Sequence, residues 1–272
     1  MIEVHGTPNL RDAVLVVALS GWVDAGRAGA GAAGFLRDHL VASRELARID
    51  LEGLVDQQQA RPIVRLADGV TRTLEWPAVE LVAGRAGRDV VVCRGPEPSL
   101  RWREITDALV GLVRTLDVRL AVTLGGMPVP VSHRRPVRVL ATATSHSLAQ
   151  ELGARRADYS GPTGMQTVLQ VALGEAGVPA AGLWAQVPHY VAGSPSPPAV
   201  RALLERLRDV ARLDLDVGAL DRGCDEYRRE VDEGLESRPD VAELVRAIEA
   251  GDDELPTGDE LASEIERFLR DE

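Results

Sequence analysis

The stretch DYSGPTGMQTVLQVALGEAGVPAAGLWAQVPHY, residues 158–190, decides the fold of this chain. It begins with a glycine- and proline-containing loop, continues as a helical stretch over Met165–Ala176, and ends in an apolar strand over Ala180–Val187. The segment VLVVALSGWVDAG, residues 14–26, changes from strand to loop to helix in the same way. Such alternation predicts an α/β protein that binds its ligand at the loops following the strands.

Other apolar runs extend this alternation. They predict strands at Ala13–Leu19, Asp89–Cys93, Val118–Leu124 and Val137–Thr144, with weaker candidates at Ile49–Val55 and Ile63–Leu66. A strand pair with a break at Pro77 is predicted from Arg72–Trp76 and Val79–Ala83. Helices are predicted over Arg27–Leu40, from a Ser99 cap to Leu116, over 145–152, and over Ala199–Leu213. The alternation predicts a three-layer α/β sandwich with a largely parallel central sheet, formed by residues 1–215.

The remaining residues, 216–272, predict a small, acidic, all-helical extension. Helical patterns cover about 218–236, 240–250 and 258–270. This segment holds 20 Asp and Glu residues against 7 Arg, whereas residues 1–215 hold 22 against 24. The formal charge of −11 therefore comes from the extension. Such a surface is either a solvated helical face or a scaffold that recruits a basic partner, which truncation of 216–272 would test.

The composition excludes several functions. All 31 basic residues are arginine, so lysine-based Schiff-base catalysis and the Walker A phosphate loop are excluded. Aromatic residues make up only 3% of the chain and no basic patch offsets the acidic extension, so we expect no nucleic-acid partner. We find no pattern for a membrane span or a signal peptide, and we expect a cytoplasmic protein without membrane contact.

Metal and disulfide chemistry have little support in the sequence. Cys93 and Cys224 are too far apart in sequence to suggest a disulfide framework or a zinc site. The five histidines form no HxH, HxxxH or HExxH pattern. We therefore expect no metal and no cofactor, and we assign no catalytic residue.

The candidate binding residues lie in loops at the ends of predicted strands or at the start of a predicted helix. They are Gly21, Trp22, Asp24 and Gly26, then Gly125, Gly126 and Pro128, then Ser160, Gly161, Thr163 and Gly164, and finally His189 and Tyr190. Each of these residues also has a structural interpretation that needs no ligand. Asp24 and Thr163 are suited to cap the helices that follow them, and the glycines are suited to form turns. Trp22 is either a cover on the core or an interface anchor.

The motif Gly29-Ala30-Gly31-Ala32-Ala33-Gly34 matches the dinucleotide fingerprint GxGxxG in letters only. In that fold the first glycine follows the strand directly, whereas here the strand ends about ten residues earlier, near Leu19. The motif therefore falls inside the next helix. We expect its glycines to let that helix approach its neighbour closely.

An enzymatic alternative uses Ser20 or Ser160 as a nucleophile, with His189 as its base. It would make the chain a hydrolase or a phosphorylase-like transferase acting at the loop edge. Neither serine lies in a GxSxG context. A geometric test separates the two hypotheses, since a nucleophile needs a histidine or carboxylate within hydrogen-bond reach.

Three segments together resemble the proteasome-assembly-chaperone family, in its bacterial, actinobacterial-type branch. They are LVVALSGWVDAG, TLGGMP, and the block DYSGPTGMQTVLQVALGEAGVPAAGLWAQVPHYV. The resemblance spans about residues 10–213, and the helical tail is similar to that branch's C-terminal extension. It implies a phosphorylase-like α/β sheet, self-association into a homo-oligomer, and no established active site.

The resemblance also implies a function and a partner. Relatives in this family help proteasome α-type subunits to assemble, and some insert a hydrophobic-Tyr-X tail between those subunits. The present chain ends Phe268-Leu269-Arg270-Asp271-Glu272, without a penultimate tyrosine. We therefore expect a non-enzymatic assembly protein whose docking uses its loops, its sheet edge or its helical extension.

Overall fold

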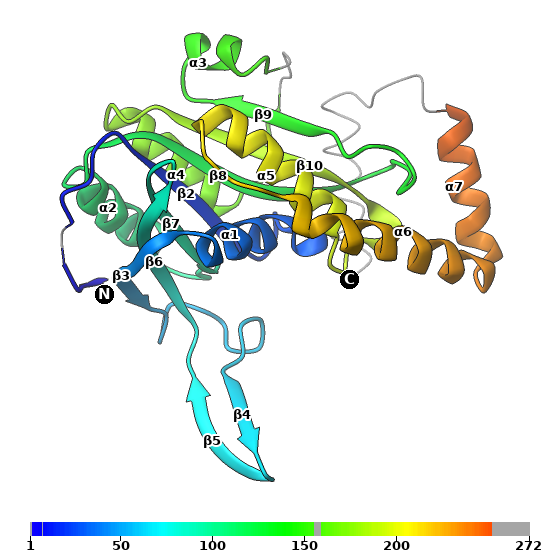
Figure 1. Cartoon of the computed structure of the whole chain (residues 1–272), viewed down its shortest axis with the longest axis horizontal. Helices are drawn as coiled ribbons and strands as arrows, with labels where there is room; N and C mark the ends of the chain where they lie inside the picture. The colour runs from blue at the N-terminus through cyan, green and yellow to red at the C-terminus, as the bar shows by residue number, and fades with distance from the viewer. Residues whose placement is uncertain (1, 7, 155–158, 252–272) are drawn as a thin grey trace.

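The computed structural model describes residues 2–6, 8–154 and 159–251. An eight-stranded sheet forms its centre, in the order β1-β3-β6-β7-β2-β8-β10-β9 (Figure 1). The strands are β1 Ile2–Val4, β2 Ala13–Ser20, β3 Val41–Asp50, β6 Ala78–Ala86, β7 Arg88–Pro96, β8 Val118–Val129, β9 Val139–Ala143 and β10 Ala180–Pro188. The helices around it are α1 Ala28–Asp38, α2 Trp102–Val113, α3 His146–Glu151, α4 Met165–Glu175 and α5 Pro197–Ala211.

The four central strands β7, β2, β8 and β10 run parallel to one another. The outer neighbours β6 and β9 are antiparallel to them, and β3 again runs with the central strands. Five of the eight strands thus share one direction. This arrangement confirms the predicted α/β fold, and it brings the carboxyl ends of all four central strands to one edge of the sheet.

Helices cover both faces of the sheet, which explains why β2 is apolar from Ala13 to Leu19. Side chains alternate between the faces of a strand. Val14, Val16 and Ala18 therefore enter the core beneath α1 and α5, while Leu15, Val17 and Leu19 enter the core beneath α2 and α4. Every one of these side chains is buried, and both layers of helix are fixed to the sheet by apolar contact.

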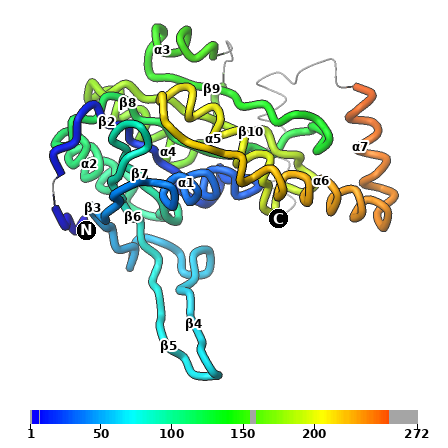
Figure 2. The backbone as a smooth tube through the Cα atoms, in the orientation of Figure 1, coloured from blue at the N-terminus to red at the C-terminus, as the bar shows by residue number. Residues whose placement is uncertain are grey.

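A two-stranded arm projects from one side of the molecule. It consists of β4 Ile63–Ala67 and β5 Val70–Glu75, which pair only with each other (Figure 2). The prediction that Arg72–Trp76 pairs with Val79–Ala83 is therefore wrong. The turn lies instead at Asp68-Gly69, where both residues have positive φ, +52° and +72°. An Asp-Gly pair of this kind favours a tight hairpin turn, which explains the pairing of β4 with β5.

Other boundaries also differ from the prediction. Strand β3 begins at Val41 rather than at Ile49, and it pairs antiparallel with β6. The residue before α2 is Arg101, and Ser99 instead accepts a hydrogen bond from the backbone N–H of Asp56 at 3.0 Å. Ser145 does cap α3, since its side chain accepts from Leu148 N at 3.2 Å.

Beyond α5 the chain continues as helices α6 Asp221–Glu236 and α7 Pro239–Gly251. Helix α6 packs against α5, and α7 packs against α6. The helix predicted over 258–270 lies outside the described residues. Among the described residues, no helix is both long and apolar enough to cross a lipid bilayer.

Candidate functional site

One of the predicted loops, residues 21–26, meets strand β8 at the carboxyl edge of the sheet. The segment 21–26 leaves β2 and crosses over β8, where Asp24 forms a parallel bridge to Gly126. The Gly126 N–H donates to the Val23 carbonyl oxygen at 2.9 Å. The segment therefore lies directly against the end of β8. The sequence predicted this proximity, because parallel strands share one edge for their carboxyl ends.

Gly125, Gly126 and Pro128 do not form the predicted loop, because they lie within β8. A Cβ at Gly126 would approach the Ala25 carbonyl oxygen to 2.2 Å, and one at Gly125 would approach the Val23 oxygen to 2.6 Å. Both glycines are thus needed for close approach of another segment to β8. The approaching chain is the protein's own 21–26 segment.

Asp24 caps helix α1 from a buried position. Its Oδ1 accepts hydrogen bonds from the backbone N–H groups of Gly29 at 2.8 Å and Ala30 at 3.2 Å. Its Oδ2 is buried without a hydrogen-bond partner among the described residues. Burial raises the pKa of Asp24 to about 6, and the two backbone hydrogen bonds and Arg27 only partly offset this. The predicted capping role is therefore observed, at the cost of an uncompensated carboxyl oxygen.

Glu97 joins three loops of the edge, and sequence reasoning did not identify it. Its Oε1 accepts from the Met165 N–H at 2.6 Å at the start of α4, and its carboxylate also accepts from the Trp22 N–H. Burial raises the pKa of Glu97, although these hydrogen bonds counteract the effect. Gly164 precedes Met165 as the cap residue, so the predicted cap Thr163 is wrong. A carboxylate placed directly after a buried strand was the available signal.

All four tryptophans of the chain line one broad groove at this edge. They are Trp22, Trp76, Trp102 and Trp184, and the groove has a volume of about 2310 Å³. Among the predicted residues, its lining includes Gly21, Trp22, Asp24, Gly126, Pro128 and Thr163. With only nine Trp, Tyr and Phe residues in the chain, this concentration marks the groove as the candidate binding surface.

The other predicted residues have different positions. Gly26 packs beside Ser196 and Val187, and Gly161 packs under the Tyr159 ring. Ser160 is exposed. His189 Nδ1 lies 3.2 Å from the Val129 carbonyl oxygen, on the side of the edge where Tyr190 faces α6 and α7. These residues therefore do not line the groove itself.

The geometry gives no support to a serine nucleophile. Ser20 Oγ donates to the Gly95 carbonyl oxygen at 3.4 Å. In the part of the chain that the structure describes, no hydrogen bond joins Ser20 or Ser160 to a histidine or a carboxylate. The same part contains no cluster of three or more His, Cys, Asp or Glu side chains that could hold a metal ion. Cys93 is buried, which raises the pKa of its thiol to about 12.

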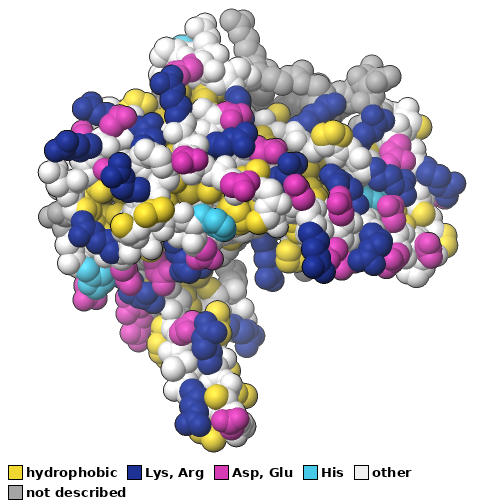
Figure 3. Space-filling view, viewed as in Figure 1, with side chains coloured by type: hydrophobic (Ala, Val, Ile, Leu, Met, Phe, Trp, Pro, Cys, Tyr) yellow, Lys and Arg dark blue, Asp and Glu magenta, His cyan; other side chains and the backbone are white. Residues whose placement is uncertain are grey.

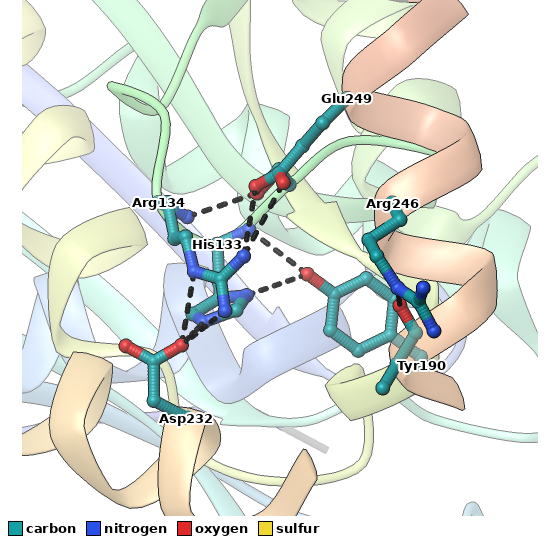
Figure 4. Close-up of polar contacts among 8 residues, drawn as sticks. His133, Arg134, Tyr190, Asp232, Arg246 and Glu249 are labelled. Atoms are coloured by element: carbon teal, nitrogen blue, oxygen red, sulfur yellow. Dashed lines mark hydrogen bonds and ion pairs between the residues drawn. The ribbon is translucent and has the colours of Figure 1, made fainter. Parts of the chain in front are cut away.

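A polar cluster fastens α6 and α7 to the sheet edge (Figure 4). His133 lies between Tyr190 and Asp232, with its Nδ1 2.8 Å from the tyrosine oxygen and its Nε2 3.0 Å from Asp232 Oδ1. Arg134 donates to Asp232 at 2.7 Å and to Glu249 at 3.2 Å. Burial raises the pKa of Tyr190 to about 12, so its hydroxyl stays neutral and serves as a hydrogen-bonding group. We interpret the cluster as a structural clamp, which holds α6 and α7 against the sheet edge.

Replacing Arg134 with alanine should loosen α7. The guanidinium pairs with both Asp232 on α6 and Glu249 on α7, so its removal breaks two ion pairs at once. His133 still contacts Asp232 and Ser132 Oγ still donates to Glu249, so we expect a partial loosening. We expect amide hydrogen exchange in α7 to accelerate by about threefold to tenfold. Arg229→Ala is the control, because the ion pair that Arg229 forms within the described residues is to Glu233 on its own helix. Equal acceleration by both variants would contradict the clamp.

Comparisons with known proteins agree with this architecture. The PAC2 family model matches residues 18–235. A proteasome-assembly chaperone homologue from Mycobacterium tuberculosis is 38% identical with a TM-score of 0.76, and the match covers 85% of this chain and 99% of that one. A PAC2 family protein from Streptomyces avermitilis is also 38% identical with a TM-score of 0.78, over 86% of this chain and 100% of that one.

More distant similarity concerns the fold alone. An archaeal proteasome activator from Pyrococcus furiosus is 19% identical with a TM-score of 0.69, over 86% of this chain and 98% of that one. No curated protein matches the chain. The predicted resemblance to proteasome assembly chaperones of actinobacterial type is confirmed by the two 38% identical structures and the family model. The chain belongs to the PAC2 family.

Proposed function

We propose that this chain is a non-enzymatic, assembly-chaperone-like protein that binds proteasome α-type subunits through its tryptophan groove. The observation that carries the proposal is the convergence of Trp22, Trp76, Trp102 and Trp184 on one groove. Its similarity to a proteasome-assembly chaperone homologue suggests which class of partner to test. The same proposal places the protein in the cytoplasm as a homo-oligomer.

The chemistry of the groove favours a protein partner. Tryptophan is enriched at the energetic centres of protein interfaces, because its large ring buries much apolar area at little entropic cost. Trp76 is 52% exposed, and Trp22 and Trp102 are half-buried, so these rings are available for contact. The groove is also wide, whereas sites for small molecules enclose most of their ligand. Asp24 and Glu97 lie at its edge, where both carboxylates are engaged by backbone N–H groups.

We further propose that residues 216–272 form an acidic helical extension to an α/β domain over 1–215. The clamp of His133 and Arg134 with Asp232 and Glu249 supports a fixed position for α6 and α7. A fixed acidic surface would favour partners with complementary basic patches.

Pull-down of the host's proteasome α-type subunits tests the proposal. Trp22→Ala should reduce capture of these subunits by at least tenfold, because truncating an anchor tryptophan costs about 2 kcal/mol or more. Leu244→Ala is the control, since this residue is 40% exposed on α7 and outside the groove. Equal capture by both variants would contradict the claim that the groove is the binding surface. No capture by the unmodified chain would contradict the claim that proteasome α-type subunits are its partner.

A further inference from the structure

The tryptophan groove continues from Trp184 to the outer edge of the sheet. Trp184 lies opposite Leu140 of β9, and its Nε1 donates to Thr142 Oγ1 at 3.2 Å. Every residue from Arg138 to Thr144 lines the groove. Within the described chain, β9 is the last strand of the sheet and has β10 as its one neighbour (Figure 1). One end of the groove is therefore built on the free edge of a strand.

The free edge of β9 carries the backbone groups of alternate residues. The Thr144 N–H donates to the Ala180 carbonyl oxygen at 3.0 Å, and the Gln186 N–H donates to the Arg138 carbonyl oxygen at 2.9 Å. Residues of an antiparallel strand turn their backbone groups alternately toward one neighbour and the other. The even-numbered residues of β9 thus face β10. The residues whose N–H and C=O groups point away from β10 are Val139, Ala141 and Ala143.

Strand β9 lacks the features that usually protect an edge. Natural edge strands are short, bulged, charged or interrupted by proline, because a free edge pairs readily with another chain. At the opposite edge of this sheet, β1 has only three residues, and the part of β3 that it leaves unpaired carries Arg44 and Glu45. Strand β9 reads VLATA, without charge or proline, and its register with β10 is unbroken. Its edge therefore remains able to accept a further strand.

Two walls stand on either side of this edge. On one side lies α4, where Gln170 Nε2 donates to Thr142 Oγ1 at 3.4 Å. On the other side α5 holds the segment after α3, because Arg206 donates to the Leu152 carbonyl oxygen. Such a recessed edge has room for a single extended chain and not for the sheet edge of a second copy. We call this part of the groove the β9 end, and its lining consists of 138–144, Ala149, 152–154, Thr167, Gln170, Val171, Trp184 and Arg206.

The charge of the β9 end favours an acidic occupant. Its lining includes Arg138 and Arg206 and, among the described residues, no Asp or Glu. Elsewhere the charges are mixed: acidic and basic side chains lie interspersed over α5 and α6 in the space-filling view (Figure 3). Val171 on α4 is 52% exposed and offers an apolar contact beside the edge. The wall residues Ala149 and Gly153 are small, which leaves space for a chain beside β9.

We propose that the β9 end of the groove binds an extended, acidic segment of a partner protein, which pairs with β9 as an additional strand of the sheet. Main-chain hydrogen bonds to the free edge supply affinity, and alternate side chains supply specificity. The side chains that face α4 contact Val171, those that face α5 are acidic and meet Arg206, and Arg138 lies beside one end of the segment. The inference deepens the proposed function, and it rests on that proposal only for the source of the segment.

Fluorescence anisotropy with a short labelled peptide tests the pairing. The probe alternates valine and glutamate and has glutamate at both ends. N-methylation of alternate amides gives two peptides, one blocked on each edge. One of them should bind about tenfold more weakly than the unmethylated probe, because it loses backbone hydrogen bonds to β9, and the other should bind unchanged. Equal effects of both methylation patterns, or no binding of the unmethylated probe, would overturn the proposal.

Variants of the chain test the same contact from the protein side. Arg138→Glu should weaken binding of the probe by about tenfold, because it replaces an attraction with a repulsion. Arg103→Glu is the control, since Arg103 is exposed on α2 and outside the groove. Equal binding by these two variants would contradict the acidic occupant.

Ala141→Pro removes an N–H that faces the free edge and leaves the hydrogen bonds to β10 in place. It should weaken binding of the probe by about tenfold, and a thermal melt close to that of the unmodified chain shows that the variant is folded. Unchanged binding by the folded variant would contradict pairing at β9. If the variant does not fold, the methylated peptides still decide the question.

The same assay identifies other occupants of the edge. Binding of the probe only after removal of residues 252–272 would overturn the proposal in favour of the chain's own acidic end. Binding that falls as the concentration of the chain rises would overturn it in favour of a second copy. Absence of probe binding overturns the inference even if proteasome α-type subunits are captured, and probe binding supports it even if they are not. The two proposals therefore fail separately.

Discussion

Replacing Asp24 with asparagine should stabilise the protein progressively more as the pH rises from 4 to 7, by about 2 kcal/mol over that interval. The carboxyl has a pKa of about 6 in the folded chain, against an ordinary aspartate value of 3.8, chiefly because it is buried. A raised pKa means that the folded state binds the proton more tightly than the unfolded state. The stability contributed by protonated Asp24 is therefore complete below pH 4 and is lost as the pH rises to about 6.

Asparagine removes this dependence, because it has no charge at any of these pH values. It retains an oxygen that can accept from Gly29 and Ala30, so the cap on α1 is preserved. Urea unfolding of both proteins at several pH values gives the difference in unfolding free energy, in which the titration of Glu97 and other carboxyl groups cancels. A difference that stays constant from pH 4 to pH 7 would show that Asp24 titrates normally.

Gly29→Ala should destabilise the protein by about 2–3 kcal/mol, although alanine favours a helix over glycine by about 1 kcal/mol. A Cβ at position 29 would lie 2.4 Å from the Leu124 carbonyl oxygen, which belongs to the backbone of β8 and cannot rotate away. Helix α1 would have to move off the sheet, and the segment 21–26 that crosses β8 would move with it. We expect the melting temperature to fall by several degrees.

Gly34→Ala is the matched control on the same helix. A Cβ at Gly34 meets nothing within 4 Å, so this variant should gain about 0.5–1 kcal/mol from helix propensity alone. Calorimetry of the two variants therefore gives shifts of opposite sign for one chemical change. Shifts of the same sign would mean that α1 does not approach β8 closely at Gly29.

The main architecture was predictable because it depends on local signals and on a general rule. Ala13–Leu19 is apolar throughout, which predicts a strand covered on both faces, and β2 is such a strand. Gly29 and Gly31 lie about ten residues after that strand, inside the next helix. This position predicts that they allow close packing of the helix and do not bind a dinucleotide. Cβ atoms there would meet Leu124 of β8 and Val200 of α5.

The errors occurred where local signals were ambiguous. Gly125-Gly126-Met127-Pro128 has the composition of a turn, yet β8 continues through it. The two glycines serve instead to leave room for the 21–26 segment, which packs directly on the strand. Asp68-Gly69 between apolar residues is the local signal for the pairing of β4 with β5, and Pro77 marks only the gap between β5 and β6.

Other features of the site require the three-dimensional structure. The four tryptophans lie between positions 22 and 184, and no spacing rule brings them to one groove. His133 and Asp232 are 99 residues apart, and their contact depends on how α6 packs on α5. Glu97 is partly predictable from sequence. Its position directly after the apolar run of β7 can be read from the sequence, but its hydrogen bond to the Met165 N–H requires the structure.

Native mass spectrometry of the host's proteasome α-type subunits, synthesised with and without this chain, tests the central claim most directly. The claim is that the chain acts by holding these subunits in its groove and not by chemistry. We predict complexes that contain the chain together with α-type subunits, and a larger fraction of subunits in rings when the chain is present. An unchanged distribution of subunits, with no complex that contains the chain, would contradict it.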